Sequence, residues 1–162
     1  MVRQIIMIGS VVLGLLLSVG CGGHAEAPIA EPMQQAVRSH AAVEVAWEDS
    51  WDSAFERAHA EGKPVLANFY AEWCVWCKHL ETVTFRDQKV ADLLADDVIP
   101  VNIDIDGDVK GLIRDHHITA PPTIVVFDPS GNELGRIPGY LPPSSFLTVV
   151  QKILRGEPVQ LS

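Results

Sequence analysis

The spacing of apolar residues predicts a helix soon after residue 48, followed by a buried strand. The apolar residues of this helix recur at steps of three and four, as on one buried face: Trp51, Ala54, Phe55 and Ala58. Asp49 or Ser50 can cap its start, and Gly62 with the following Lys63-Pro64 ends it. Residues 65–70 are apolar enough to form a central strand of a sheet.

Two more helices, a strand and a short helix are predicted next. The helix that contains Cys74 continues past Leu80 to about Val83, and Asp87 can cap the following helix. The inward residues of that following helix are Val90, Leu93 and Leu94. From residue 99 to 105 every second position is apolar, as in a strand with one buried face: Ile99, Val101, Ile103 and Ile105. A turn at 106–108 leads to a short helix with one inward face: Val109, Leu112, Ile113 and His116.

The last part of the chain predicts a β-hairpin followed by a helix. Residues 123–127 are β-branched and aromatic, and residues 133–137 form the returning strand. Pro142 and Pro143 open the final helix, where proline is tolerated, and Gly156 ends it. The buried residues of this helix share one face: Phe146, Leu147, Val150, Ile153 and Leu154.

The order of these elements predicts an α/β fold. Helices and strands alternate in the first half, which indicates parallel strands joined by crossovers, and the terminal hairpin indicates antiparallel pairing. We therefore expect a sandwich with a central mixed β-sheet flanked by helices, ending in a C-terminal β-hairpin and helix.

The N-terminal part has a different character. Residues 1–21 have the pattern of an export signal, with a positive charge at Arg3, an apolar run over 5–19 and small residues before Cys21. The run is shorter than the roughly 20 residues that span a bilayer, although an uncleaved N-terminal membrane anchor is the alternative. Residues 22–46 lack aromatic side chains and predict a flexible spacer, and residues 47–162 form the domain.

Charge and cysteine content exclude several classes of function. The 162 residues carry a formal net charge of −9, and nucleic acid requires clustered Lys and Arg, so we expect no nucleic-acid partner. The three cysteines are too few for a disulfide-stapled fold or for two zinc-binding pairs. The histidines show no spacing that points back to the cysteines, so no metal site is predicted.

Cys74 and Cys77 form a C-x-x-C pair between the predicted strand over 65–70 and the helix that follows it. Such a pair at the start of a helix is typical of a dithiol/disulfide redox centre. The spacing places both sulfur atoms on one helical turn, close enough to bridge. A purely structural disulfide or inert thiols are the alternative.

Several segments, in the same order and at matching distances, resemble the thioredoxin family from Trp47 to Arg155: Phe69-Tyr70-Ala71-Glu72-Trp73-Cys74-x-x-Cys77-Lys78, Asn102-Ile103-Asp104 and Pro122-Thr123. Within it, other short segments are similar to the C-terminal thioredoxin-like domain of DsbD-type thiol:disulfide interchange proteins: Gly62-Lys63-Pro64-Val65, Tyr70-Ala71, Cys74-Val75-x-Cys77-Lys78 and Thr84-Phe85.

The resemblance and the position of the cysteines predict their roles. Cys74, at the helix N-terminus, would be the exposed attacking thiol, because unpaired backbone N–H groups there stabilise a thiolate. Cys77, one turn further in, would be the shielded resolving thiol. No cofactor is needed beyond the redox-active Cys74–Cys77 disulfide.

The resemblance also implies supporting residues around the cysteines. Pro122 corresponds to the family's cis-proline, which would turn the backbone at Ala120-Pro121 so that its polar groups pair with an extended substrate. Trp73 matches a family position beside the active site. Trp76 lies in the variable dipeptide, and we expect a partly exposed docking role for it rather than a place in the core.

The chain departs from the family at two positions. Asn68 stands where many members have a buried Asp that moves protons to and from the resolving thiol, and Pro100 stands where they have a Lys. We therefore expect slower or differently pH-dependent deprotonation of Cys77, with Glu72, Glu81 or water as substitutes.

The end of the N-terminal apolar run resembles a bacterial lipobox, Leu17-Ser18-Val19-Gly20-Cys21, although Ser18 replaces the usual Leu. The resemblance implies acylation of Cys21, and Gly22 after it favours the outer membrane over the inner membrane. Acyl chains at ~0.8 kcal/mol per methylene would hold the domain on the periplasmic side of a bacterial membrane, where disulfides persist.

We therefore interpret the chain as an exported, membrane-tethered thiol:disulfide oxidoreductase that reduces disulfides of extracytoplasmic proteins. Its partners would be exported proteins with disulfides and a membrane electron donor that carries thiols, since the chain has no flavin or nicotinamide motif. Two alternatives are a disulfide oxidase or isomerase, and a non-catalytic binding module on the same fold.

Overall fold

The computed structural model describes residues 44–107 and 110–160 of the chain. The predicted export signal, Cys21 and the predicted spacer up to residue 43 lie outside these residues, as does Val109. Among the residues that the structure describes, no helix has both the length and the apolar character needed to cross a bilayer.

The described residues form ten elements, which follow the predicted order except for one additional helical turn, η1. The helices are α2 (Trp51–Glu61), α3 (Val75–His79), α4 (Gln88–Asp96), α5 (Lys110–Asp115) and α6 (Pro143–Leu154), and η1 (Leu80–Thr84) is a π-helical turn. The strands are β1 (Val65–Tyr70), β2 (Ile99–Asp104), β3 (Thr123–Phe127) and β4 (Glu133–Pro138).

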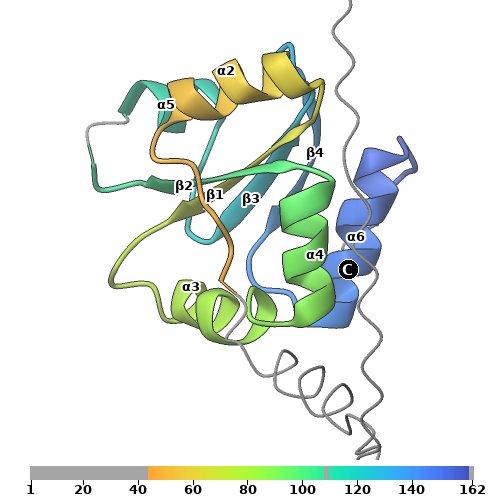
Figure 1. The fold of residues 1–162 in the computed structure, drawn as a ribbon. Helices are drawn as coiled ribbons and strands as arrows, with labels where there is room; N and C mark the ends of the chain where they lie inside the picture. Colours follow the sequence, from red (N-terminus) through yellow and green to blue (C-terminus); the bar gives the residue numbers. More distant parts are fainter. Residues whose placement is uncertain (1–43, 108–109, 161–162) are drawn as a thin grey trace, which may run out of the picture. The chain divides into compact units, whose positions relative to one another are not determined.

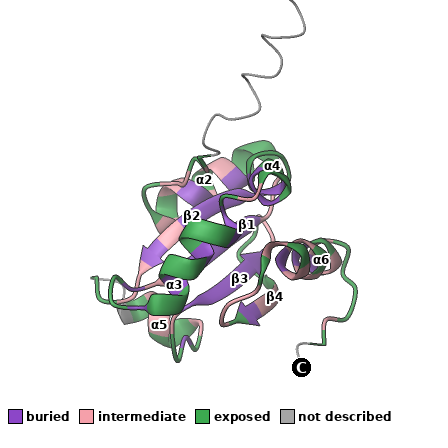
Figure 2. Ribbon diagram, turned by 90° about the horizontal axis from the view of Figure 1, so that it is seen from below, coloured by how far each residue is buried: buried purple, intermediate pink, exposed green. Residues whose placement is uncertain are grey.

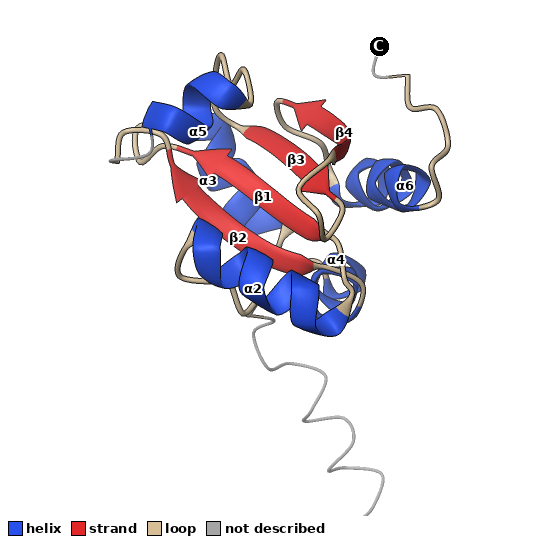
Figure 3. Cartoon of the chain, turned by 90° about the horizontal axis from the view of Figure 1, so that it is seen from above, coloured by secondary structure: helices blue, strands red, loops and turns tan. Residues whose placement is uncertain are grey.

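The four strands make one mixed sheet in the order β2-β1-β3-β4, which confirms the predicted fold class (Figure 3). β1 runs parallel to β2, and β3 runs antiparallel to both β1 and β4. The carboxyl ends of β1, β2 and β4 and the start of β3 therefore meet at one edge of the sheet. Loops that leave this edge can bring residues distant in sequence together.

Each face of the sheet carries its own apolar core, because successive side chains of a strand point to opposite faces. Val65, Ala67 and Phe69 of β1 pack on one face with α2 and α5, whereas Leu66 packs on the other face with α4 and α6. Figure 1 shows α2 and α5 together on one side of the sheet and α3, α4 and α6 on the other. The buried strands lie between these two helical layers (Figure 2).

Local sequence signals explain where the helices begin and end. Ser50 caps α2 through a reciprocal pair of hydrogen bonds with Ser53, and Gly62 ends this helix in the left-handed conformation with φ 66°. The Asp87 carboxylate accepts hydrogen bonds from the first amides of α4. These three residues confirm the predicted boundaries of the two helices.

The structure corrects the predicted helix after Cys74. The regular helix α3 ends at His79, and the chain continues as the π-helical turn η1, in which the Phe85 amide donates to the Leu80 carbonyl at 2.8 Å. The wider turn carries both Leu80 and Thr84 into the core, where they are fully buried. Apolar spacing alone does not distinguish such a turn from an α-helix.

Some predicted core positions lie at the margin of the core. Strand β2 ends at Asp104, so Ile105 is only partly buried, and Leu147 and Leu154 are partly buried on α6. Conversely, Val45 packs against the core although the sequence assigns it to the spacer. Packing of the domain thus begins before Trp47.

Candidate active site

The Cys74–Cys77 pair lies where the loop after β1 becomes α3. The two residues form a disulfide with a Cα–Cα distance of 5.2 Å. Cys74 is the N-cap of α3, and its sulfur accepts a hydrogen bond of 3.1 Å from the Cys77 amide. The sulfur of Cys74 thus occupies the place where a helix offers unpaired N–H groups, an environment that favours a thiolate after reduction.

The two cysteines are equally buried, with 6% of each residue exposed. This differs from the expectation that Cys74 is the more exposed thiol. In the disulfide form both sulfur atoms are tied to the first turn of α3, and Ala71 with the partly buried Tyr70 and Ile105 packs against them. Both cysteines therefore share one shielded environment while the bond is intact.

The loop before β3 lies at the same edge of the sheet. The peptide bond between Pro121 and Pro122 is cis, the form that the resemblance implies for Pro122. Thr123 pairs with Phe69 of β1, so Pro122 lies beside the end of the strand that leads to the cysteines. Ala120 is exposed, and its carbonyl accepts a hydrogen bond of 2.7 Å from the Thr123 hydroxyl.

Two tryptophans beside the cysteines are exposed, 66% for Trp73 and 58% for Trp76. The Trp73 indole Nε1 donates a hydrogen bond of 2.6 Å to the Asp106 carboxylate. The Trp76 ring stacks on Tyr140, with centroids 5.5 Å apart. Trp76 is thus exposed as expected, and both rings offer an accessible face next to the cysteines.

Asn68, at the position of the family's buried Asp, pairs with another neutral amide. Its Nδ2 donates a hydrogen bond of 2.9 Å to Oδ1 of Asn102, the residue opposite it on β2. Asn68 is 6% exposed, and its Oδ1 is buried without a hydrogen-bond partner among the described residues. Pro100, which stands where many family members have a Lys, pairs with Leu66 in the sheet. Asn68 is therefore paired with a neutral amide, and the Asn68–Asn102 pair cannot titrate.

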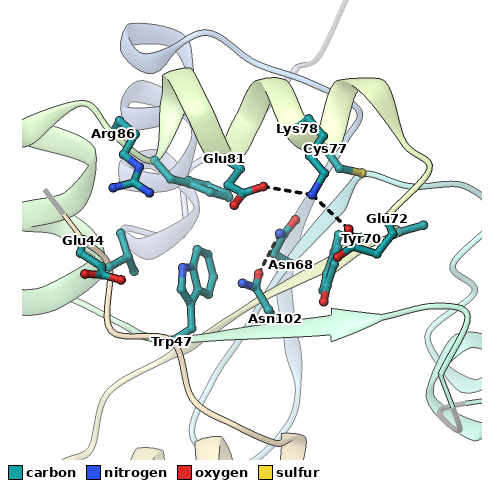
Figure 4. A pocket seen from close by; sticks show the side chains of 13 residues that line it. Glu44, Trp47, Asn68, Tyr70, Glu72, Cys77, Lys78, Glu81, Arg86 and Asn102 are labelled. Atoms are coloured by element: carbon teal, nitrogen blue, oxygen red, sulfur yellow. Dashed lines mark hydrogen bonds and ion pairs between the residues drawn. The ribbon is translucent and has the colours of Figure 1, made fainter. Parts of the chain in front are cut away.

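A cavity of about 240 Å³ lies behind the disulfide, lined by Asn68, Asn102 and Cys77 together with charged residues (Figure 4). The Lys78 ammonium lies 3.1 Å from the Glu72 carboxylate and 3.5 Å from the Glu81 carboxylate. Glu72 and Glu81, the predicted substitutes for the missing Asp, thus line the same cavity as Cys77.

These charges influence the groups around them. The hydrogen bond from Lys78 to Glu72 raises the pKa of the Lys78 ammonium, so this side chain stays charged. Burial, and then the nearby Asp104 carboxylate, raise the pKa of Tyr70. The cavity is large enough to hold water, and the side-chain amides of Asn68 and Asn102 in its lining can bind it.

Three residues of the site have no role predicted from the sequence: Asn102, Asp106 and Tyr140. Each contacts a predicted site residue from another loop or strand. Asn102 lies within the strand predicted over 99–105, and Asp106 directly follows it. Because this strand is parallel to β1, its carboxyl end lies at the same edge of the sheet as the cysteines, and this was the available signal for both residues. In the part of the chain that the structure describes, no cluster of His, Cys, Asp and Glu could hold a metal ion.

Comparison with known proteins gives the same picture of the fold. Residues 51–154 match the family model of the thioredoxin-like domain. The thiol:disulfide interchange protein DsbD of Ralstonia nicotianae is 37% identical over 106 residues, which are 64% of this chain and 17% of that protein. The chain thus spans less than a fifth of the length of this curated relative.

Solved structures are similar over most of the domain. The solution structure of a thioredoxin from Thermus thermophilus has a TM-score of 0.62 and 26% identity, and the match covers 67% of this chain and 86% of that chain. The oxidised DsbD C-terminal domain of Neisseria meningitidis has a TM-score of 0.55 and 21% identity, with 67% and 98% covered. At 21% identity, the similarity to this DsbD domain shows a shared fold only.

Proposed function

Because this chain belongs to the thioredoxin-like domain family, we propose that it is a thiol:disulfide oxidoreductase that reduces disulfides in extracytoplasmic proteins. The observation that carries the proposal is the Cys74–Cys77 disulfide at the N-terminus of α3, in a chain similar to DsbD over 106 residues. The same chemistry on a tethered domain would serve many exported partners.

The proposed reaction is two successive thiol–disulfide exchanges. The Cys74 thiolate attacks one sulfur of the partner's disulfide, forming a mixed disulfide and releasing the other sulfur as a thiolate. The Cys77 thiolate then attacks the sulfur of Cys74, forming the Cys74–Cys77 disulfide and releasing the second partner sulfur. Two electrons pass to the partner, which takes up two protons, and a membrane dithiol protein would reduce the domain again.

The local structure supports this division of roles. Cys74 caps the helix and accepts the Cys77 amide hydrogen bond, an arrangement that stabilises negative charge on its sulfur. Cys77 lines the polar cavity behind the disulfide, where water can carry the proton that its thiol must release. Cys74 is therefore the proposed nucleophile and Cys77 the proposed resolving thiol.

Trapping with Cys77→Ala tests the proposal. In this variant the mixed disulfide on Cys74 cannot be resolved, so exported proteins should accumulate as adducts that reducing agent releases. Cys74→Ala is the matched control and should trap nothing. If Cys77→Ala forms no adducts and the reduced wild type reduces no protein disulfide, the chain is a binding module instead.

Equilibration with a thiol buffer tests the direction of the reaction. A reductase should have a potential below about −200 mV, near the thioredoxins, whereas an oxidase would lie near about −120 mV. An oxidising potential together with adducts in the trapping experiment would favour the oxidase or isomerase.

We further propose that acylation of Cys21 tethers the domain to the periplasmic side of a bacterial membrane, with the outer membrane favoured. Labelling with a palmitate analogue should mark the wild type but not Cys21→Ser. If both proteins stay unlabelled and both sediment with membranes, an uncleaved N-terminal anchor accounts for the tether.

A further inference from the structure

The edge of the sheet near Cys74 carries different chemistry on its two sides. On the β2 side, Trp73 follows β1 and donates its indole hydrogen bond to Asp106, which follows β2. On the other side, the Trp76 ring stacks on Tyr140, which follows β4. The order β2-β1-β3-β4 separates these two aromatic surfaces.

The Trp73–Asp106 pair combines three properties that suit a cation. The hydrogen bond of 2.6 Å restrains the orientation of the indole and keeps the carboxylate at its edge. The ring is 66% exposed, so its electron-rich face is open to a ligand. Asp106 is also exposed, and accepting a hydrogen bond from a neutral indole leaves its negative charge intact.

The surrounding charges reinforce this preference. Asp104 ends the strand that leads to Asp106, and Glu72 immediately precedes Trp73. The nearest cation among the described neighbours of Glu72, the ammonium of Lys78, is shared between the Glu72 and Glu81 carboxylates. Among these described side chains, carboxylates therefore outnumber ammonium groups, and a positively charged side chain would find complementary charge.

On the opposite surface, the His79 ring contacts both Trp76 and Tyr140 edge-on, which adds a third ring to the stacked pair. The loop that carries Tyr140 is held by two hydrogen bonds, from the Gly139 amide to the Pro122 carbonyl and from the Thr84 hydroxyl to the Leu141 carbonyl. This surface suits an apolar side chain. A basic residue is therefore favoured on one side of the target cysteine only.

We infer that the Trp73–Asp106 pair is a specificity subsite for an Arg or Lys side chain next to the target cysteine in an extended partner segment. This inference rests on the proposed function, because it names the class of disulfide on which Cys74 acts. The partner would present a basic residue to Trp73 and Asp106 while its apolar neighbours meet Trp76 and Tyr140.

The test uses short peptides whose single cysteine is blocked by a coloured aromatic thiol. Arg, its uncharged isostere citrulline, or Glu is placed before or after the cysteine, and release of the coloured thiol by the reduced wild type is followed. In one of the two placements the Arg peptide should react about 10-fold faster than the Glu peptide at low salt, with citrulline between them. High salt should reduce the difference.

Asp106→Asn supplies the specific variant, because the amide oxygen can still accept the Trp73 indole hydrogen bond while the charge is lost. We expect the Arg-to-Glu rate ratio to fall at least threefold while the citrulline rate is unchanged. Asp96→Asn is the matched control. Asp96 is exposed at the end of α4, which precedes β2, so it lies toward the opposite edge of the sheet.

The possible results separate this inference from the proposed function. If the wild type releases the thiol from every peptide at the same rate regardless of charge, the subsite is wrong and the oxidoreductase stands. If Asp96→Asn lowers the ratio as much as Asp106→Asn, the preference reflects the charge of the whole molecule and the subsite is again wrong. If no peptide reacts, the proposed function itself fails.

Discussion

Asn68 and Asn102 face each other on adjacent parallel strands and are joined by a hydrogen bond of 2.9 Å between their side-chain amides. Neither group can take up or release a proton near neutral pH. The cavity behind Cys77 is therefore polar without a titrating group on these two strand positions. We therefore expect water, Glu72 or Glu81 to transfer the proton of Cys77, because both carboxylates line this cavity on either side of α3.

Replacement of Asn68 by Asp should make stability depend on pH. Burial raises the pKa of such a carboxyl above its value in the unfolded chain, so the folded state holds the proton more tightly. The Asn68→Asp variant therefore keeps its stability below the unfolded pKa of about 3.9 and loses it as the pH rises through the folded pKa. Above the unfolded pKa, each pH unit up to the folded pKa costs as much as about 1.4 kcal/mol.

Urea denaturation of Asn68→Asp between pH 4 and pH 8 measures this loss against the wild type. Asn68→Ala is the control, because it disrupts the amide pair without adding a titrating group and should lower stability equally at every pH. A flat difference between Asn68→Asp and the wild type would show that the carboxylate is solvated or paired in the cavity.

His116 should make the wild type less stable in mild acid. Its ring packs against Trp51 and Phe127, and burial lowers its pKa below the ordinary 6.5. The unfolded chain then binds more protons, so the contribution is fully present above the unfolded pKa and is lost as the pH falls through it toward the folded pKa.

His116→Phe keeps an aromatic ring between Trp51 and Phe127 and removes the titration. Melting temperatures at pH 7.5 and at pH 5 should therefore differ less for His116→Phe than for the wild type. His116→Gln, which lacks the ring, should be less stable at both pH values while losing the same part of the pH dependence. Equal pH dependence in all three proteins contradicts the prediction.

Gly135 of β4 has no room for a side chain. A Cβ built there would lie 2.9 Å from Cγ1 of Ile153, with two further carbons of that side chain within 3.2 Å. Gly135→Ala should therefore destabilise the domain by about 1–3 kcal/mol, because the branched Ile153 is packed on α6 and cannot easily move. Denaturant unfolding gives this difference directly.

Gly111→Ala is the matched control on α5, where the added Cβ has no described atom within 4 Å beyond its chain neighbours and the backbone of its own helix. It should leave stability unchanged or raise it by up to about 1 kcal/mol, since alanine favours helix more than glycine does. Combining Gly135→Ala with Ile153→Val removes one of the three close carbons and should recover part of the loss. No recovery would locate the clash elsewhere.

Thr84 links the π-helical turn to the loop of Tyr140. Its buried hydroxyl donates a hydrogen bond of 2.7 Å to the Leu141 carbonyl. Thr84→Val has nearly the same shape but leaves that carbonyl unpaired, so it should cost about 1–3 kcal/mol of stability. Thr82→Val removes a similar hydroxyl on the exposed side of the helix and should change stability by less than about 0.5 kcal/mol.

The sequence was sufficient to predict the elements with strong local signals. The bounds of β1 and β3 agree with the predicted strands, because both strands are apolar runs bounded by turn residues. Ser50 and Asp87 were recognisable as caps for the same kind of reason, since the capping residue and the amides it binds are neighbours in the chain. Locally encoded features of this kind depend little on the rest of the fold.

Contacts between distant residues could not be predicted in the same way. The pairs Asn68–Asn102, Trp73–Asp106 and Trp76–Tyr140 each depend on strand order or on the path of a loop. The π-helical turn at Leu80 likewise has a distant partner, because the buried Thr84 hydroxyl donates to the Leu141 carbonyl, 57 residues away. Such features follow from tertiary packing rather than from the periodicity of the chain.

The Pro121–Pro122 pair restricts the direction of hydrogen bonding at the mouth of the site. Neither residue has an amide hydrogen, and the Pro122 carbonyl already accepts the Gly139 amide at 2.8 Å. A polypeptide main chain lying along these two residues can therefore only give hydrogen bonds and can receive none from them. A proline or an N-methylated residue at the facing position would make no such bond, whatever its side chain.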